Sequence, residues 1–542
     1  MSVTQPSIHP AAAQQSYRDS GRWPQLCLPD VVRSIARESP GKLAVIDGRS
    51  NRRVSYGELW QDASRIVAFL RERGIGAGDG VSVQLPNWYE TVAVDLAVLA
   101  LGARLNPLLP DYRRHELTHI LGASQARAYF SPAIYRGFNY CQLADAVMGD
   151  LPDITTHIVV GDQPPAGRMT LTDALRTEPI AGADLPASNP ARVSELIFTS
   201  GTESVAKAVM HTEETTNSSV LATIRHLGLG PGDRVWMPSP IGHSTGLNFG
   251  VRLPLLSGLA VVLQDRWEPV HAAELIERNG VTYTLAATTF LHDLLQAAES
   301  SSRDISSLQY FGCGGATVPP ELVQQARSRG VRVLRLYGST EALIVSWNQP
   351  GSPPGKLDNT DGLVLDQMDV QAWDDNGEPL PPGEVGELTI QGPSVCAGFF
   401  SDPVRTAATF TADGWLHSGD LGTIDADGYV TILGRKKEIV IRGGLNIAPR
   451  EIEELLATMP GVHEVAVVGL PDPRLGETVC ACVVPAADAD ITLDQAVSFL
   501  RGCDLATYKL PQHLVLVTEI PKTATGKLRK TELRDSVLNA YA

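Results

Sequence analysis

The sequence has no hydrophobic run long enough to cross a membrane. Its most apolar early stretch, Thr91 to Ala103, is about a dozen residues long and contains Asp95, whereas a spanning helix needs about 20 apolar residues. The first twenty residues, Met1 to Ser20, are rich in Gln, Ser and Ala and lack the apolar segment of a secretory signal. We therefore expect no membrane span. We interpret residues 91–103 as a buried helix and the first twenty residues as a mobile tail.

Cysteine is scarce, and its spacing fits neither disulfides nor zinc. The seven cysteines are odd in number and scattered, at positions 27, 141, 313, 396, 480, 482 and 503, without the paired spacing of a zinc site. Free thiols of this kind are typical of a reducing compartment, so we expect a cytoplasmic protein. Cys480 and Cys482 stand two apart in an alternating apolar run, which predicts that both face one side of a strand. We assign no metal to cysteine.

Positive charge is also in short supply. The 45 Lys and Arg residues are outnumbered by 61 Asp and Glu residues, which gives a net charge of −16, and no Lys/Arg-rich run stands out. This balance argues against nucleic acid or an anionic membrane as the main partner. Hydrophobic residues make up 43% of the 542-residue chain. We expect ordinary globular packing in at least two domains, because a single core rarely serves a chain of this length.

The order of helical and strand patterns predicts an α/β fold. Residues Tyr56 to Arg73 carry apolar side chains at helical spacing behind a capping box of Ser55 and Glu58. The next segment, Val81 to Leu85, has the pattern of a short strand. The same alternation returns between Arg234 and Arg329, which is typical of parallel sheets covered by helices. Ligands of such sheets bind at the carboxyl ends of the strands.

The composition changes twice in the last third of the chain. After Trp347 it shifts to Gly, Pro and Asp with alternating strand patterns up to Leu433, which indicates a small β subdomain. From Arg435 onwards, helix and strand patterns form an α+β unit of about 100 residues. We therefore predict an N-terminal part, residues 1–434, made of two doubly wound α/β subdomains plus the β subdomain. A smaller C-terminal α+β domain, residues 435–542, follows it.

A polar loop follows a short apolar run near the middle of the chain. After Leu196, Ile197 and Phe198, the loop offers small side chains, hydroxyls and backbone N–H groups before one cation. Its residues are Thr199, Ser200, Gly201, Thr202 and Lys207. Such a loop suits a polyanion such as a chain of phosphates. On its own, the same composition also fits a surface turn.

Six further motifs follow this loop in order. They are Tyr337-Gly-Ser-Thr-Glu341, Gly386-Glu-Leu-Thr-Ile390, Gly414-Trp-Leu-His-Ser-Gly-Asp420, Gly434-Arg435, Arg442-Gly-Gly-Leu-Asn446 and Pro521-Lys-Thr-Ala-Thr-Gly-Lys527. Together with the loop, they resemble the adenylate-forming superfamily of acyl- and aryl-CoA synthetases, adenylation domains and luciferases. The resemblance extends from about Leu28 to Leu538.

The resemblance implies a two-step reaction on a carboxylic acid. The acid attacks the α-phosphorus of ATP with help from Mg²⁺ and cationic side chains, which gives an acyl adenylate and pyrophosphate. Coenzyme A then displaces AMP. By resemblance, Glu341 is the magnesium carboxylate, Lys527 stabilises the charge that develops during adenylation, and His243 stands beside the acyl carboxylate.

The resemblance also implies a nucleotide site and a moving lid. The residues implied in AMP binding are Gly315, Ala316, Tyr337, Gly338, Ser339, Thr340, Asp420 and Arg435. Asp420 would accept hydrogen bonds from both ribose hydroxyls, which suits a carboxylate. The C-terminal domain is implied to rotate between the two half-reactions, with Lys437 at its hinge and Gly443 and Gly444 on the path of CoA.

The predicted substrate is a neutral acid. Amino-acid-selecting relatives place an Asp near His243 to pair with the substrate amine, and this chain has none between Trp236 and Gly250. Small residues stand on the segments expected at the acyl pocket and leave room for a bulky hydrophobic acid. They are Gly242, Gly246, Gly312 and Gly314.

The phosphate loop departs from the family pattern. Where relatives have Thr-Ser-Gly-Thr-Thr-Gly-x-Pro-Lys-Gly, this chain has Thr199-Ser-Gly-Thr-Glu-Ser-Val-Ala-Lys-Ala208. Ala206 in place of Pro loosens the loop by about 0.4–1 kcal/mol, and Ala208 in place of a glycine at positive φ would cost about 1–2 kcal/mol. Glu203 adds a charge of the same sign as the triphosphate. We therefore predict a weak or lost adenylation step.

The same prediction leaves thioester formation from a supplied acyl adenylate intact, so a partner adenylating enzyme is one source of that adenylate. Arg335, where the family often has Gln, and Thr317, where it often has Pro, are further departures. Three other interpretations stay open. These interpretations are a complete two-step synthetase, a stand-alone adenylation enzyme that loads a carrier protein, and a non-catalytic relative that only binds ligands.

Overall fold

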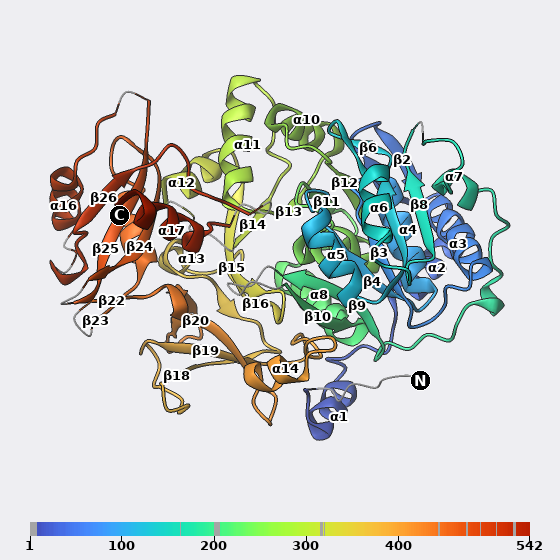
Figure 1. Ribbon diagram of the computed structural model, residues 1–542, viewed down its shortest axis with the longest axis horizontal. Coiled ribbons are helices and arrows are strands. Elements are labelled where there is room, and N and C mark those ends of the chain that lie inside the picture. Colours follow the sequence, from blue (N-terminus) through green and yellow to red (C-terminus); the bar gives the residue numbers. More distant parts are fainter. Residues whose placement is uncertain are drawn as a thin grey trace.

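The computed structural model shows a large body and a smaller C-terminal body (Figure 1). It describes residues 8–541 apart from 163, 200–205, 315–317, 319, 443–444, 473–474, 488, 504, 506 and 524–526. The large body contains two mainly parallel sheets with helices packed on them and a small antiparallel sheet. The predicted fold class is confirmed: a mixed α/β fold with a large N-terminal part and a smaller C-terminal domain.

The larger of the two main sheets has nine strands in the order β17-β16-β15-β14-β13-β11-β12-β1-β2. Its centre is parallel, and only the edge strands β2, β16 and β17 run antiparallel to their neighbours. The strands are β1 (Leu43–Asp47), β2 (Arg52–Ser55), β11 (Arg234–Met237), β12 (Ala260–Leu263), β13 (Tyr283–Leu285), β14 (Tyr310–Gly314), β15 (Arg332–Ser339), β16 (Leu343–Trp347) and β17 (Leu363–Val364).

The second sheet has six strands in the order β10-β9-β4-β3-β5-β8. They are β3 (Gly80–Val83), β4 (Arg104–Pro107), β5 (Ala126–Pro132), β8 (Thr156–Val160), β9 (Val193–Thr199) and β10 (Lys207–Thr212), and a small hairpin of β6 (Ile134–Tyr135) and β7 (Phe138–Asn139) follows β5. Only β10 is antiparallel to its neighbour, and Lys207 on β10 pairs with Thr199 on β9. The polar loop of the sequence therefore connects two adjacent strands.

Helices cover these sheets as the periodicity predicts. The helix α3 (Tyr56–Glu72) begins with the predicted capping box of Ser55 and Glu58. Side chains on all sides of α4 (Tyr89–Ala100) are buried, which confirms the predicted buried helix. The other helices of this body are α2 (Leu28–Glu38), α5 (Arg114–Ala123), α6 (Tyr140–Met148), α7 (Leu171–Ala174), α8 (Glu213–Leu227), α9 (Leu253–Ser257), α10 (Pro269–Asn279), α11 (Thr288–Ser300), α12 (Pro320–Ser328), α13 (Pro354–Asn359) and α14 (Pro403–Thr409).

The predicted β subdomain is a four-stranded antiparallel sheet. Its strands are β18 (Asp369–Trp373), β19 (Gly386–Gln391), β20 (Leu416–Ile424) and β21 (Val430–Arg435). The C-terminal body begins with β22 (Val440–Arg442), β23 (Leu445–Ile447), α15 (Pro449–Leu456) and β24 (Val462–Asp472). It continues with β25 (Gly476–Pro485), α16 (Leu493–Gly502), β26 (His513–Leu516) and α17 (Lys530–Tyr541). Cys480 and Cys482 on β25 are buried in one apolar cluster, as predicted.

The N-terminal segment corrects one prediction. Residues 8–20, expected to belong to a mobile tail, contain the helix α1 (Ala11–Asp19) and pack against the large body. The His9 ring lies against Trp23 with 5.3 Å between ring centroids, and Tyr17 contacts the same ring at 5.2 Å. Trp23 Nε1 donates to the Pro393 carbonyl at 2.8 Å. The three rings that hold the segment are too widely spaced in sequence to produce an apolar pattern.

Across the part of the chain that is described, no helix combines the length and the apolar character that a membrane crossing requires.

Candidate active site

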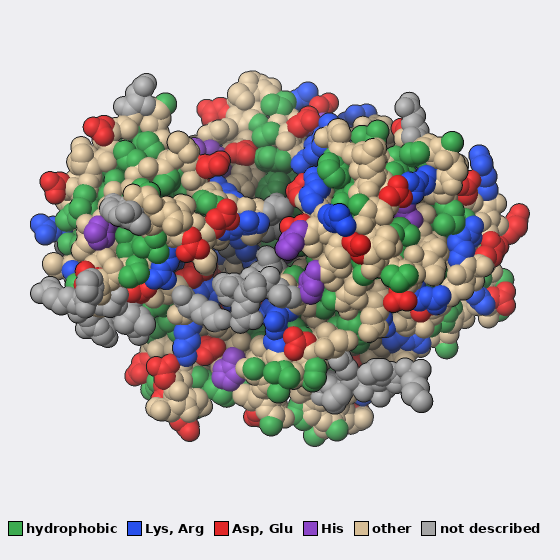
Figure 2. Space-filling model, viewed as in Figure 1, with side chains coloured by type: hydrophobic (Ala, Val, Ile, Leu, Met, Phe, Trp, Pro, Cys, Tyr) green, Lys and Arg blue, Asp and Glu red, His purple; other side chains and the backbone are tan. Residues whose placement is uncertain are grey.

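A cleft opens at the carboxyl ends of the parallel strands, where ligands of such sheets bind. It has a volume of about 940 Å³ including its open mouth, and residues from both bodies line it. Figure 2 shows the surface hollowed between the two bodies, with Lys and Arg side chains on the walls. The large body contributes the segments after β11 and β13 and the ends of β14, β15 and β16. The C-terminal body contributes Lys527.

Next to the cleft-lining residues Leu336 and Gly338, Tyr337 contacts a buried carboxylate that is held by two partners. Tyr337, on β15, donates its hydroxyl to Asp420 Oδ2 at 2.7 Å. Arg435 Nε lies 2.8 Å from Asp420 Oδ1, because β20 and β21 pair these two residues. Burial raises the pKa of Asp420, and Arg435 and the Tyr337 hydroxyl oppose that rise. The carboxylate therefore offers two oxygens in a fixed orientation, which suits a ribose diol.

A second carboxylate lies beside the phosphate-loop lysine. Lys207 Nζ is 2.5 Å from Glu341 Oε1. Burial of Glu341 works to raise its pKa, but Lys207 outweighs burial, with help from Arg435, and the pKa lies below its ordinary value. Glu341 is thus ionised, as a cation ligand must be. Thr199 Oγ1, at the end of β9, is buried and has no hydrogen-bond partner among the described residues.

These residues fit Mg²⁺ in the form in which it accompanies nucleotides. Mg²⁺ is usually held by one or two carboxylates together with phosphate oxygens and water rather than by an all-protein cage. No cluster of three or more His, Cys, Asp or Glu that could hold a metal occurs among the described residues. Bound Mg²⁺ would take Glu341 as an anionic ligand and could take the Thr199 hydroxyl, unpartnered among the described residues, as a second oxygen, while phosphates and water would complete the shell.

His243 and Lys527 both line the cleft. The Thr245 N–H donates to His243 Nδ1 at 3.3 Å, so the ring proton lies on Nε2. Burial and the nearby Lys527 lower the pKa of His243 to about 4, so the ring is neutral at pH 7. The Lys527 side chain is exposed to the cleft, yet the surrounding protein and Arg435 lower its pKa. The Lys527 ammonium and the neutral His243 ring thus face the same cleft as its apolar lining residues.

Two sequence models cover most of the chain. The one described as AMP-binding enzyme matches residues 32–400, and the one described as AMP-binding enzyme C-terminal domain matches residues 451–527. The chain belongs to the AMP-binding enzyme family. This confirms the predicted adenylate-forming superfamily and the predicted enzyme class, an AMP-forming ligase.

Relatives and solved structures of this family align over nearly the whole chain. The medium-chain fatty-acid–CoA ligase of Escherichia coli K12 is 35% identical, over 96% of this chain and 92% of the relative. The 2,3-dihydroxybenzoate-AMP ligase of Bacillus subtilis 168 is 32% identical, over 97% of both chains. The crystal structure of ATP-bound MatB from Rhodopseudomonas palustris is similar with a TM-score of 0.85 and 28% identity, over 95% of this chain and 100% of that one.

Several predicted residues of this AMP-binding enzyme lie outside the described residues. They are Ser200, Gly201 and Thr202 of the phosphate loop, Gly315 and Ala316 of the AMP site, and Gly443 and Gly444 of the CoA path. Lys437 lies in a short 3₁₀ helix, Lys436–Glu438, between β21 and β22, and its side chain is also outside the description. Of the other predicted residues, Gly314, Gly338, Ser339 and Thr340 line the cleft.

The glycines predicted to widen the acyl pocket lie where a side chain would overlap neighbouring segments. Gly246 does not line the cleft, and a Cβ there would overlap the Pro240 carbonyl. A Cβ at Gly242 would overlap the backbone of Leu108, and one at Gly312 would overlap Trp347. Their missing side chains let segments of the protein pack closely rather than make room for a ligand. Gly314 does lie at the cleft surface, but a Cβ there would also overlap the Leu336 carbonyl.

The supports of the 337–341 segment were not recognisable in the sequence. His211 Nε2 lies 2.7 Å from the Thr340 carbonyl, and the Cys396 N–H donates to the Glu341 carbonyl at 2.7 Å. Leu343 has a φ of 57°, in the left-handed region that costs a non-glycine residue about 1–2 kcal/mol. Strain of this kind at a cleft wall is common at functional sites. None of these residues belongs to a motif, so only the tertiary contacts reveal them.

Proposed function

We propose that this enzyme converts a neutral carboxylic acid into its CoA thioester through an acyl adenylate. One observation carries the proposal: Lys527 of the C-terminal body lines the same cleft as His243 and interacts with both Asp420, which suits ribose, and Glu341, which suits phosphate with Mg²⁺. A cation in that place can act only while the C-terminal body holds its present orientation.

In the proposed first step, a carboxylate oxygen of the acid forms a bond to the α-phosphorus of ATP, and the bond to the pyrophosphate oxygen breaks. Asp420 holds the ribose, and Lys207 pairs with the phosphates, which compete with Glu341 for its ammonium. Lys527 faces the negative charge that develops on the α-phosphate. Bound Mg²⁺ would neutralise phosphate charge at Glu341. The neutral His243 ring excludes water beside the acyl carboxylate without exchanging a proton at pH 7.

In the proposed second step, the thiol of CoA attacks the acyl carbon, and AMP leaves with the pair of electrons of the broken C–O bond. Lys527 must withdraw to open the path of the thiol, which the predicted rotation about Lys437 achieves. The domain boundary at residues 434 and 435 remains part of this proposal. Arg435, its first lid residue by prediction, is the last residue of β21 and pairs with Asp420 of the large body.

We infer that the acid is neutral and hydrophobic from the lining of the cleft. Phe249, Phe290, Leu343 and Ile344 supply much of the wall, and among the described lining residues Lys527 is the only ionisable side chain besides the neutral His243. Beyond the reach of Lys527, a charged group on the acyl chain would lose its hydration against this apolar wall, which is strongly unfavourable.

The predicted weakness of the adenylation step loses one support. Neither Ala206 nor Ala208 has a positive φ. Ala208 pairs with Phe198 in the regular ladder between β9 and β10, and its carbonyl accepts from the Phe400 N–H at 2.9 Å. Ala at 208 is therefore free of the strain expected there. Any remaining handicap arises from the lost proline ring at 206 or from residues 203 and 204, which lie outside the described residues.

A stand-alone adenylation enzyme is the second candidate function, because the similar Bacillus subtilis protein is named as an AMP ligase. Purified protein is incubated with a panel of neutral acids, ATP, Mg²⁺ and CoA, and the products are identified by mass spectrometry. We expect an acyl-CoA and AMP. Adenylate without thioester would favour the second candidate.

A parallel incubation uses chemically synthesised acyl adenylate and CoA without ATP. Thioester from this reaction alone would show that the first step is impaired while the second is intact. Absence of product in both incubations would contradict the proposal and favour a ligand-binding relative.

A further inference from the structure

A π-helix forms one wall of the cleft. It is η2 (Thr245–Arg252), and it continues directly into α9. The Leu253 N–H donates to the Asn248 carbonyl, which is the five-residue spacing of a π-helix. Such helices are rare, occur mostly as single turns, and concentrate at functional sites. An eight-residue π-helix beside a substrate cleft therefore needs stabilising contacts with the rest of the protein.

Residues four apart on this helix share a face, and two such faces have different surroundings. Thr245 and Phe249 line the cleft. Gly246 and Gly250 lie against the segment after β11, because a Cβ at Gly246 would overlap the Pro240 carbonyl and one at Gly250 would overlap the Met237 side chain. The helix is thus pressed onto the segment that contributes Ser239 and Pro240 to the same cleft.

A third face carries a fully buried arginine that bonds to two other elements and to its own helix. The Arg252 side chain is 1% exposed. Its Nη1 donates to Glu213 Oε2 at 2.7 Å and to Asn217 Oδ1 at 3.0 Å, both on α8. Its Nη2 donates to Glu195 Oε1 on β9. Its Nε donates to Asn248 Oδ1 at 3.1 Å, one turn earlier on the π-helix.

Asn248 closes this network. Its Nδ2 donates to Glu195 Oε2 at 3.2 Å, so both oxygens of Glu195 receive hydrogen bonds from the same face of the helix. Two side chains four residues apart are thereby fixed to one carboxylate on β9. The helix can neither turn about its axis nor change from the π to the tighter α spacing without breaking at least one of these bonds.

The composition of the network argues against a role in stability alone. A buried ion pair often stabilises no more than an apolar cluster of the same volume, because desolvation offsets the attraction. Here one guanidinium faces two carboxylates. Asp95, wholly buried nearby, has a pKa raised well above its ordinary value by burial and by Glu195. Glu213 Oε1 has no hydrogen-bond partner among the described residues. Fixed geometry is what such a network provides.

We propose that Arg252 is a specificity-determining positioning residue, which fixes the rotation and spacing of the π-helix and thereby selects the acyl chains that fit the cleft. The inference rests on the proposed function, because it needs an acid to be activated. Arg252 touches no part of the cleft. It acts through Asn248 and the helix backbone on Thr245 and Phe249, whose side chains face the acyl chain.

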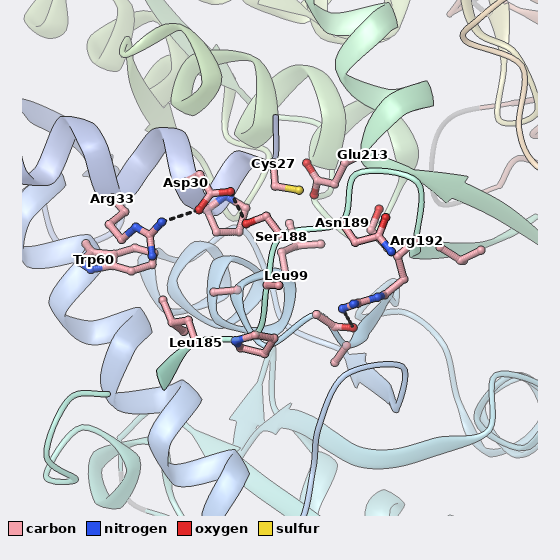
Figure 3. Close-up of a pocket in the computed structure, with 18 residues that line it drawn as sticks. Cys27, Asp30, Arg33, Trp60, Leu99, Leu185, Ser188, Asn189, Arg192 and Glu213 are labelled. Atoms are coloured by element: carbon pink, nitrogen blue, oxygen red, sulfur yellow. Dashed lines mark hydrogen bonds and ion pairs between the residues drawn. The ribbon is translucent and has the colours of Figure 1, made fainter. Parts of the chain in front are cut away.

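The test compares acid selectivity in variants of increasing severity. Glu213→Gln keeps an acceptor oxygen for Arg252. Glu213 also borders a second cleft, where Figure 3 shows its side chain next to that of Cys27. Asn248→Ala removes the link within the helix, and Arg252→Lys keeps the charge but cannot reach all four partners. For each, kcat/KM is measured with straight-chain acids of four to twelve carbons, together with the KM for ATP.

We expect Asn248→Ala and Arg252→Lys to change the ratio of kcat/KM between the best acid and an acid two carbons different by about tenfold or more, the scale on which one methylene is recognised. The KM for ATP should change by less than about twofold, and Glu213→Gln should resemble the wild type. Hydrogen–deuterium exchange should rise for amides of residues 245–252 in the first two variants.

Leu143→Ala is the control for loss of stability, because Leu143 is buried on α6 and the cleft lining does not include it. It should lower the midpoint of thermal unfolding but leave the acid ratio unchanged. If Asn248→Ala and Arg252→Lys keep the wild-type ratio within about twofold while exchange in the π-helix rises, the inference is wrong. If the wild type activates no acid at all, the proposed function has failed first, and the exchange measurement alone tests whether Arg252 holds the helix.

Discussion

At the scale of single residues, the two half-reactions should separate by position. Asp420 is proposed to hold the nucleoside in both steps, so Asp420→Asn should lower each by on the order of 10- to 100-fold, the effect of losing hydrogen bonds to a charged group. Lys527→Ala should lower only adenylation, because the proposed rotation takes Lys527 out of the cleft before the thiol enters. Adenylation is measured as ATP–pyrophosphate exchange, and the second step as thioester formation from supplied adenylate.

Asp425→Asn is the control for this pair, since Asp425 belongs to the same β subdomain but bonds to Lys356 on the surface. It should leave both steps unchanged. Equal losses in the second step for Asp420→Asn and Lys527→Ala would show that Lys527 stays in the cleft throughout.

Buried histidines should make the protein less stable in mild acid. Burial lowers the pKa of His9, His157 and His243 from 6.5 to about 4. Between pH 6.5 and about 4 these histidines bind protons in the unfolded chain but not in the folded chain. The free energy of unfolding should therefore fall as the pH falls from about 6.5 to about 4. These residues should have little effect above about pH 7. The midpoint of urea unfolding, measured across this range, checks the expectation.

His157→Gln should flatten that dependence, because Gln does not titrate and can still bond to Ser131, which lies 2.9 Å from His157 Nε2. His271→Gln is the control, since His271 is half-exposed. An unchanged slope in His157→Gln would contradict the assignment to this residue.

At the scale of elements, the phosphate loop should be limited by residues 203 and 204 rather than by 208. Ala208 lies in a regular ladder, so Ala208→Gly should only destabilise the protein, by about 0.5–1 kcal/mol. Glu203→Thr combined with Ser204→Gly removes the negative charge before the triphosphate and should raise ATP–pyrophosphate exchange. A tenfold increase in Ala206→Pro with Ala208→Gly would instead place the handicap at the later positions.

How far the elements could be predicted depended on their local signals. The helix α3 was foreseen because periodicity and its capping box agree within one segment. The docking of α1 was missed because it depends on His9, Tyr17 and Trp23 meeting the 393–395 segment, which is distant in sequence. The π-helix was missed for the same reason. Asn248 and Arg252, four residues apart on this helix, bond to Glu195 and Glu213, which lie outside the segment.

At the scale of the whole molecule, one ion-pair cluster connects the two bodies. Asp361, in the large body, receives Arg335 from β15 at 2.9 Å and Arg450 from α15 of the C-terminal body at 3.2 Å. Burial works to raise the pKa of Asp361, but Arg450 and Arg335 lower it below its ordinary value. The C-terminal body is therefore held in the orientation that places Lys527 in the cleft.

Arg450→Ala should loosen this orientation and lower adenylation by more than it lowers thioester formation from supplied adenylate. Lys509→Ala is the matched control, because Lys509 pairs with Glu451 inside the C-terminal body at 2.6 Å. It should affect both steps equally or not at all. A larger loss in the second step for Arg450→Ala would mean that Arg450 serves the other orientation of the lid.

The sequence by itself determined the family, the α/β class and the identity of the chemical groups, because the motifs that carry Lys207, Glu341, Asp420, Arg435 and Lys527 are contiguous and chemically distinctive. The tertiary structure alone decided how those groups are held. It showed that Lys207 pairs with Glu341, that Gly246 accommodates a carbonyl rather than a substrate, and that Ala208 is unstrained. The physical reason is that a local pattern fixes backbone conformation and residue type, whereas pairing, strain and pocket shape arise from contacts between segments far apart in the chain.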